Sequence, residues 1–263
     1  MKKRYALILA YDGANYCGWQ IQPGVETVQG TLESALSTIL RQEVAVIGCG
    51  RTDTGVHASY YVSHIEAELN RSVADLHYHL NNYLPADIAI IDLQEVSSDF
   101  HARFNAVERE YQYFIQLEKN PFMHRYAAFS HQKLDVEKMN EAAKKLLIAE
   151  EFGAFCKAGS QNQTNICDVR LAEWEVNESQ LTFTISANRF LRNMVRAIVG
   201  TLIEVGRGKL TVTDFEEIID SQDRTKAGFS APANGLFLTD VKYGSDQLDT
   251  KNYKRVKLGL NGK

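Results

Sequence analysis

The residues best suited to chemistry lie in one short stretch, Gly48 to Ala58, which reads GCGRTDTGVHA. It follows an apolar run, Val44–Ile47, and closely spaced glycines at the end of a strand let the backbone bend sharply and approach a ligand. The bend carries one arginine, Arg51, and one carboxylate, Asp53. A carboxylate on such a loop can serve as a nucleophile. The same residues also fit a simple turn in which Asp53 caps its own backbone, and the loop alone does not decide between the two.

A second candidate is Arg196, inside a helix that the sequence predicts over residues 190–205. The apolar stripe of this helix consists of Leu191, Met194, Ile198 and Leu202. Its opposite face is expected to carry Arg189, Arg192 and Arg196. Arg196 stands between two apolar neighbours, Val195 and Ala197. Because a buried arginine needs an anionic partner, Asp53 is a candidate for that role.

The elements that must position these residues alternate along the first hundred positions. Strands are expected at 5–11, 44–47, 60–65 and 88–96, and helices at 27–40 and from Val73, capped by Ser72, to before Pro85. The resulting order, β-α-β-β-α-β, is that of a ferredoxin-like unit.

The second half of the chain is predicted to have a similar order of strands and helices, with insertions. Strands are expected at 110–117, 166–176, 180–187 and 235–241, and helices at 136–149, 190–205 and 213–220. We therefore expect an α+β fold in which two ferredoxin-like (βαββαβ) halves join into one antiparallel sheet. The expected domains are an N-terminal lobe at 1–105 that carries the Asp53 loop, a C-terminal lobe at 106–245, and a polar, basic tail at 246–263.

The composition bounds the class of protein. A chain of 263 residues, 44% hydrophobic and 24% charged, suits one large or two modest globular domains. The net charge of −4 provides no overall field that attracts polyanions, so a nucleic acid would need a locally basic cleft. The four cysteines form neither a C-x-x-C pair nor a zinc-type spacing, which indicates free thiols.

The first eleven residues faintly resemble a signal peptide, with Met1 and the basic residues 2–4 followed by the largely apolar residues 5–11. The apolar run is short and lacks a convincing cleavage site, so a strand is the better interpretation. No segment approaches the roughly 18 apolar residues of a membrane span. We therefore expect a cytoplasmic protein.

Further blocks accompany the Asp53 loop in a fixed order. They are Asp12-Gly13 with YCGWQIQ at 16–22, TVQGTLE at 27–33, FHARFNA at 100–106, REYQY at 109–113, FLRNMVR at 190–196 with Val199-Gly200, and APANGL at 231–236. Together with RTDTGVHA at 51–58, these blocks resemble the TruA-type tRNA pseudouridine synthase family nearly from end to end.

The chain departs from the family pattern in three places. Thr54 replaces the usual alanine of the loop, and Asn193 replaces the usual histidine of the late helix. The segment at 150–165 differs from the family's G-x-H-D-F-x-x-F block. These changes bear on RNA contacts rather than on the chemistry at Asp53.

The resemblance implies a reaction and a set of roles. Enzymes of this kind break the N1–C1′ bond of uridine, turn the base and rejoin it through C5 without redox change, so neither a cofactor nor a metal is implied. Asp53 would be the catalytic carboxylate, and attack at C1′, addition to the ring and elimination to a glycal all stay open. Arg196 would keep that carboxylate ionised, and Tyr111 would stack on the base and relay the C5 proton. Leu236 would pack under the base, although Tyr111 and Leu236 also suit plain core positions.

The resemblance also implies contacts to RNA. The target uridine lies in a stem and must be extruded, and Arg51 would fill the space that it leaves. The candidate backbone contacts, each of which also fits a solvated surface charge, are Arg103, Arg109, Lys157, Arg189 and Arg192. The implied partner is tRNA, the implied targets are the uridines at positions 38 to 40 of the anticodon stem-loop, and the implied assembly is a homodimer.

Two other classes of protein deserve comparison. A non-catalytic ferredoxin-like RNA-binding module would be expected to carry paired aromatic motifs on its central strands, and the sequence has none. A glycoside or nucleoside hydrolase that uses Asp53 would normally need a second carboxylate, and the loop offers none nearby.

Overall fold

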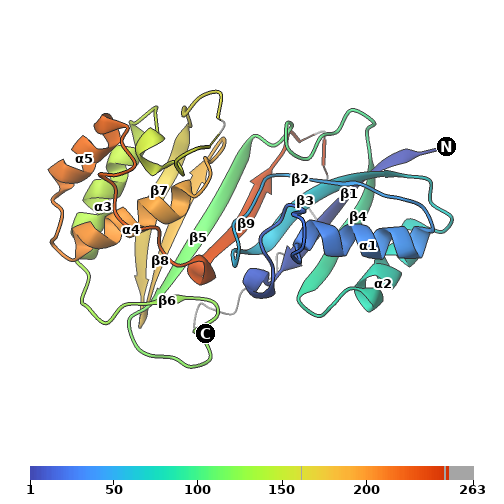
Figure 1. Cartoon of the computed structure of the whole chain (residues 1–263), viewed down its shortest axis with the longest axis horizontal. Coiled ribbons are helices and arrows are strands. Elements are labelled where there is room, and N and C mark those ends of the chain that lie inside the picture. Colours follow the sequence, from blue (N-terminus) through green and yellow to red (C-terminus); the bar gives the residue numbers. More distant parts are fainter. Residues whose placement is uncertain (161, 246, 249–263) are drawn as a thin grey trace. The chain divides into compact units, whose positions relative to one another are not determined.

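The computed structural model describes residues 1–160, 162–245 and 247–248. Over this part of the chain the protein is a mixed α+β structure with nine strands, β1 to β9, and five α-helices, α1 to α5 (Figure 1). The strand pairs with an assigned direction are antiparallel, except for β5 with β6. The tail expected at 246–263 lies outside the described residues apart from positions 247 and 248.

The chain divides into two compact units. Among the described residues, unit 1 consists of Met1–Val107 together with those from Leu238 onward, and unit 2 consists of Glu108–Phe237. Strand β9 (Leu236–Lys242) therefore begins in unit 2 and ends in unit 1. No local sequence signal marks that passage, because the strand is buried throughout except at its last residue.

Unit 1 carries four strands of its own and two helices. They are β1 (Lys3–Tyr11), α1 (Val28–Leu40), β2 (Val46–Gly48), β3 (His57–Ala67), α2 (Val73–Tyr83) and β4 (Ile88–Val96). The strand order is β4-β1-β3, with β2 and β9 also beside β3. Strand β1 is antiparallel to both neighbours, and Leu7 lies opposite Ser63 and Leu93. The predicted order of elements in this part of the chain is confirmed.

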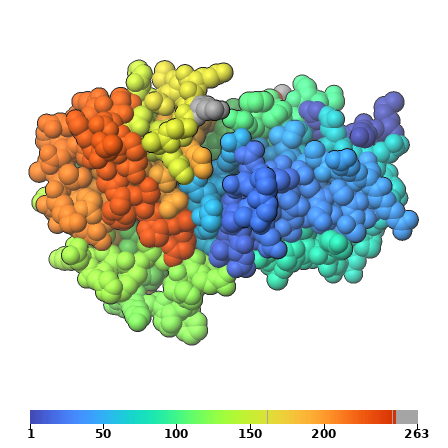
Figure 2. All heavy atoms as spheres, in the orientation of Figure 1, coloured from blue at the N-terminus to red at the C-terminus, as the bar shows by residue number. Residues whose placement is uncertain are grey.

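Helix α1 shows how the sequence builds this unit. Thr27 caps the helix by accepting a hydrogen bond from the Gly30 amide at 3.3 Å. The buried residues Leu32, Leu36 and Leu40 recur every four positions and form one stripe. Each such leucine stabilises the fold by about 1.5–3 kcal/mol. Figure 1 shows α1 and α2 alongside the strands of unit 1, and in Figure 2 the blue atoms of α1 lie on the viewed face of that unit.

Unit 2 carries the remaining elements. They are β5 (Glu108–Gln116), β6 (Ala128–Phe129), α3 (Val136–Lys144), β7 (Val169–Asn177), β8 (Gln180–Ala187), α4 (Met194–Gly206) and α5 (Val212–Ser221). The strand order is β9-β5-β8-β7, and β6 adds a short parallel pair to β5. The hairpin predicted between 166–176 and 180–187 is confirmed, with Tyr111 of β5 opposite Ile185 of β8. The orange atoms of α5 lie on the viewed face of this unit in Figure 2.

The helix expected over 190–205 begins four residues later than predicted, at Met194. Asn193 precedes it with a left-handed φ of 64°, and the Arg192 carbonyl accepts a bond from the Lys157 amide at 3.0 Å instead of from the helix. Arg189 and Arg192 therefore lie before the helix and share no helical face with Arg196, which corrects that prediction. The helix expected over 136–149 also ends early, at Lys144, and continues as a 3₁₀ turn over Lys145–Leu147.

Candidate active site

Asp53 lies in the loop between β2 and β3, where it is half-buried. The turn is closed by the main chain, because the Asp53 carbonyl accepts a hydrogen bond from the Val56 amide at 3.1 Å. Gly55 within the turn has a positive φ of 76°. The bend therefore does not depend on the Asp53 carboxylate to close it.

Residues 13–19 pack directly against the backbone of this loop. Gly18 has a φ of 82°, and a Cβ there would lie 2.4 Å from the Thr52 carbonyl oxygen. A Cβ at Gly13 would lie 2.0 Å from the Val56 carbonyl oxygen. The two glycines thus allow a close approach on both sides of Asp53. The Trp19 amide completes the contact by donating to the Thr52 carbonyl at 3.3 Å.

Aromatic side chains lie beneath the start of the same loop. The Tyr11 and Thr52 hydroxyls are 2.9 Å apart, and the Tyr61 hydroxyl donates to the Gly50 carbonyl. The rings of Trp19 and Tyr61 stack with centroids 4.0 Å apart. Because these rings are almost fully buried, the first half of the loop is anchored from the core of unit 1.

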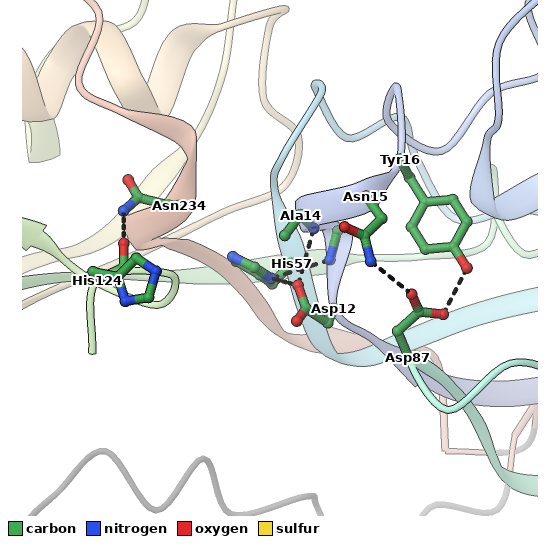
Figure 3. Close-up of polar contacts among 9 residues, drawn as sticks. Asp12, Ala14, Asn15, Tyr16, His57, Asp87, His124 and Asn234 are labelled. Carbon is green, nitrogen blue, oxygen red and sulfur yellow. Dashed lines mark hydrogen bonds and ion pairs between the residues drawn. The ribbon is translucent and has the colours of Figure 1, made fainter. Parts of the chain in front are cut away.

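A polar network ties the neighbouring segment to β3 and to the residue that precedes β4 (Figure 3). His57, at the start of β3, is buried, and its Nδ1 lies 3.0 Å from Asp12 Oδ1 and 3.1 Å from the Gly13 amide. At the other end of the segment, the Asp87 carboxylate accepts from the Tyr16 hydroxyl at 2.6 Å and from Asn15 Nδ2 at 3.2 Å. Burial, aided by Asp87, raises the pKa of the Tyr16 hydroxyl, so this bond persists across the physiological range.

Two of the arginines proposed to contact RNA belong to unit 1. Arg51 is exposed, two residues before Asp53 in the loop. Arg103 is exposed on the loop that follows β4. Both side chains are thus carried by backbone that is fixed from within the unit, while the side chains themselves face solvent.

Arg196 is held in unit 2 by the segment that precedes β9. Its Nε donates to the Ala231 carbonyl at 2.7 Å, and its own carbonyl accepts from the Ala231 amide at 2.9 Å. Buried Tyr113 lies close by and donates to the Pro232 carbonyl at 2.9 Å. Burial raises the pKa of Tyr113, and the nearby Arg196 charge opposes that rise. These bonds fix the orientation of the guanidinium.

The other predicted site residues of unit 2 differ in their surroundings. Tyr111 is half-buried on β5, and its ring meets that of Phe190 edge-on, with centroids 5.2 Å apart. Leu236 is buried at the start of β9. Arg109 donates to the Asn188 carbonyl at 2.8 Å. Arg189 is half-buried, whereas Arg192 and Lys157 are exposed.

Each unit thus contributes its own part of the predicted set. Asp53, Arg51 and Arg103 belong to unit 1, and the remaining residues belong to unit 2. The sequence analysis missed the Tyr16–Asp87 bond, since nothing near Asp87 indicates a partner 71 positions away. It also missed Tyr113, although this residue lies within the REYQY block.

Within the described part of the chain, no group of three or more histidine, cysteine or carboxylate side chains could hold a metal ion. Within the same part of the chain, none of the helices has the length and apolar character needed to cross a membrane.

Comparison with known proteins identifies the family of this chain. A family model described as tRNA pseudouridine synthase matches residues 7–105 and 142–244. The tRNA pseudouridine synthase A of Bacteroides thetaiotaomicron is 50% identical over 257 residues, which cover 97% of this chain and 96% of that protein. The enzyme of the same name from Bacteroides fragilis is 51% identical, covering 92% of this chain and 96% of that protein. That of Porphyromonas gingivalis is 48% identical, covering 92% and 98% respectively.

These likenesses define an RNA-modifying isomerase. The chain belongs to the tRNA pseudouridine synthase family, as the sequence blocks indicated, and its reaction is the conversion of uridine in tRNA to pseudouridine.

Proposed function

We propose that the protein isomerises uridines of the tRNA anticodon stem-loop, at positions 38 to 40, with Asp53 as the catalytic carboxylate. The reaction breaks the N1–C1′ bond, forms a C5–C1′ bond, and moves one proton from C5 to the solvent while N1 gains another. Substrate and product are isomers, so the reaction needs neither an oxidant nor a nucleotide cofactor. The observation that carries the proposal is the immobilised loop, in which two glycine contacts and a main-chain turn fix the backbone at Asp53. Such preorganisation is what a reacting carboxylate needs.

Arg196 is proposed to pair with Asp53 and to keep it ionised when RNA closes over it. Two features of unit 2 support this role. Arg196 and Glu204 are the two residues of α4 that are not buried. The bond from Arg196 Nε to Ala231 fixes the plane of the guanidinium. A fixed, always charged group is suited to pair with a carboxylate.

Tyr111 and Leu236 are proposed to receive the target base. The half-buried ring of Tyr111, held edge-on by Phe190, would stack on the base and relay the C5 proton. Leu236 would pack beneath it. Arg51 would occupy the space that the extruded base leaves. The candidate phosphate contacts are Arg103, Arg109, Arg189 and Arg192.

Further parts of the proposal concern architecture and assembly. We propose that each unit is one ferredoxin-like half. The strand orders β4-β1-β3 with β2 beside β3, and β9-β5-β8-β7, both support this. The expected domain boundary near residue 105 and the cytoplasmic location belong to the same proposal and rest on the sequence pattern, whereas the homodimer rests on the family resemblance.

The test is the Asp53→Asn variant, which keeps the size of the side chain and removes its charge. It should abolish tritium release from tRNA that carries C5-labelled uridine, while tRNA binding persists. Turnover retained by this variant would defeat the assignment of Asp53. Mapping of pseudouridine in transcript tRNA after incubation with the wild type tests the positions, and conversion confined to uridines outside the anticodon arm would overturn that part.

A further inference from the structure

Phe104 is an exposed aromatic residue on the loop that follows β4. It is 73% exposed. The guanidinium carbon of Arg103 lies 5.4 Å from the centre of its ring. The imidazole of His101 lies 4.3 Å from that centre at an angle of 35°. Three flat groups, two of them polar or charged, therefore gather on this loop.

The buried side of the loop is locked to unit 1. The Ala102 amide donates to His64 Nδ1 at 3.1 Å, and the Ala102 carbonyl accepts from the Tyr243 hydroxyl at 2.6 Å. The buried ring of Phe100 packs against Tyr243 with centroids 5.2 Å apart. Both main-chain groups of Ala102 are thus hydrogen-bonded, which fixes the backbone that carries the exposed Phe104 ring.

His101 holds the two residues that follow it. Its Nδ1 accepts hydrogen bonds from the Arg103 amide at 3.2 Å and from the Phe104 amide at 3.3 Å. An imidazole nitrogen can accept only when it carries no proton. Burial lowers the pKa of His101, and the charges of Arg4 and Arg103 lower it further, which maintains that state.

We propose that Phe104, with Arg103 beside it, is a stacking site for an unpaired nucleobase of the bound tRNA, in addition to the uridine that reacts. The inference rests on the proposed function, since it takes tRNA as the ligand. Nucleobases stack on exposed aromatic rings, and a guanidinium beside the ring can stack on the same base or pair with its phosphate. A second protein copy would also cover an apolar ring, but the Arg103 cation over this ring favours a polyanion.

The central test compares three variants in tRNA binding at several salt concentrations. Phe104→Ala should weaken the binding of transcript tRNA about 10- to 100-fold. Its salt dependence should match that of the wild type, because stacking releases no counterions. Phe104→Leu keeps apolar area without a flat ring and should lose most of the same affinity. Phe122→Ala, which removes an 84% exposed phenylalanine from unit 2, is the matched control and should bind as the wild type does.

The second experiment uses a fully paired RNA duplex, which has no unpaired base that could stack on Phe104. Phe104→Ala should bind it as tightly as the wild type. A Phe104→Trp variant adds a spectroscopic readout, because the natural Trp19 and Trp174 are each only 3% exposed. The emission of the introduced indole should be quenched when tRNA binds and should be unchanged when duplex binds. Thermal unfolding of all variants should match that of the wild type, since the ring is exposed.

Several results would overturn the inference. They are wild-type tRNA affinity in Phe104→Ala or Phe104→Leu, an equal loss on duplex RNA, and an equal loss in Phe122→Ala. A change in sedimentation of Phe104→Ala without a change in tRNA affinity would show that a second copy covers the ring. Failure of the proposed function has a separate signature, namely a wild type that binds tRNA but converts no uridine of the anticodon arm.

Discussion

The Asp53 loop of unit 1 and helix α4 of unit 2 each position one charged side chain, but by different means. The loop is held by main-chain contacts from residues 13–19, which approach closely only because two of them are glycine. Arg196 instead belongs to a helix that is buried on nearly every side, and its Nε donates to the neighbouring Ala231 carbonyl. A loop becomes rigid only through contacts with other segments of the chain. A helix already has its own main-chain hydrogen bonds and needs only packing to fix its position.

Among the variants that separate the role of the loop from that of the helix, Arg196→Ala is expected to lose the most activity. The variant loses both the proposed partner of Asp53 and the bond to Ala231. We expect kcat/KM to fall about 10³-fold, the upper range for removing an electrostatic group from an active site. Arg196→Lys keeps the charge but not the planar fork, and should fall between this variant and the wild type. Tritium release under single-turnover conditions measures the effect.

A control for this variant is available on the same helix. Glu204→Gln removes the ion pairs to Arg207 at 3.0 Å and Lys209 at 2.8 Å, but leaves Arg196 untouched. It should cost less than about 1 kcal/mol in the free energy of unfolding and leave kcat unchanged. If both variants lost activity equally, the role of Arg196 would reduce to the integrity of α4.

The second effect concerns the loop and is expected from Gly18→Ala. The added methyl group would lie 2.4 Å from the Thr52 carbonyl oxygen, so the backbone next to Asp53 must shift. A displacement of about 1 Å at a reacting group can cost about 10²-fold in rate, and we expect kcat to fall by that factor while tRNA affinity changes little. Quench-flow turnover and equilibrium binding separate the two quantities.

Gly24→Ala is the matched control for the loop. Gly24 has a similar φ of 77°, but a Cβ there would have no atom within 4 Å. This variant should carry only the backbone penalty of about 1–2 kcal/mol in unfolding free energy and keep its activity. Equal rate losses in the two variants would mean that left-handed backbone strain, not contact with the loop, limits catalysis.

The third prediction concerns the pH dependence of stability, which should differ between the two units. Burial lowers the pKa of His64 to about 4, aided by the charges of His101 and Arg4. The native state therefore keeps His64 neutral, while the unfolded chain takes up its proton near pH 6.5. As the pH falls from 6.5 toward 4, the free energy of unfolding should drop by about 2–3 kcal/mol. Protonation of His64 Nδ1 would also remove the acceptor of the hydrogen bond that the Ala102 amide donates.

This loss should appear first in unit 1. Each unit contains one tryptophan, Trp19 in unit 1 and Trp174 in unit 2. Trp174→Phe therefore leaves a reporter of unit 1, and Trp19→Phe leaves a reporter of unit 2, for denaturant unfolding at several pH values. His64→Asn should flatten most of the pH slope, whereas the exposed His79→Gln should not. An unchanged slope in His64→Asn would assign the acid sensitivity to other groups.

The elements that the sequence predicted well carry local signals. Thr27, Ser72 and Asp135 accept bonds from amides three residues on, so the starts of α1, α2 and α3 could be predicted from neighbouring residues alone. The loop at Asp53 was equally visible, because an apolar run ends there in closely spaced glycines.

What the sequence could not predict depends on distant partners. The start of α4 was placed too early because the apolar spacing continues back through Leu191. A contact from Lys157 and the left-handed backbone of Asn193 instead make the helix begin at Met194. The two-residue strand β6 is too short to show a periodicity. For the site, residue types indicated Asp53 and Arg196, but not the main-chain contacts that hold them.

The smallest effect tests one of those hidden supports, the bond between Tyr16 and Asp87. Asp87→Ala leaves the partly buried Tyr16 hydroxyl without its acceptor and also removes the bond from Asn15. We expect a loss of about 1–3 kcal/mol in unfolding free energy. We also expect a several-fold fall in kcat, because the segment that contacts the Asp53 loop is loosened. Denaturant unfolding and tritium release measure the two effects.

Adding Tyr16→Phe to Asp87→Ala separates support of the loop from general destabilisation. Removal of both partners of a buried hydrogen bond costs less than removal of one, so the double variant should regain part of the stability that Asp87→Ala loses. If kcat recovers together with stability, the bond acts on Asp53 through the position of residues 13–19. Strictly additive losses would show that Tyr16 and Asp87 are not coupled, and the position of the loop would then depend on its other contacts, such as those at the two glycines and the Trp19 amide.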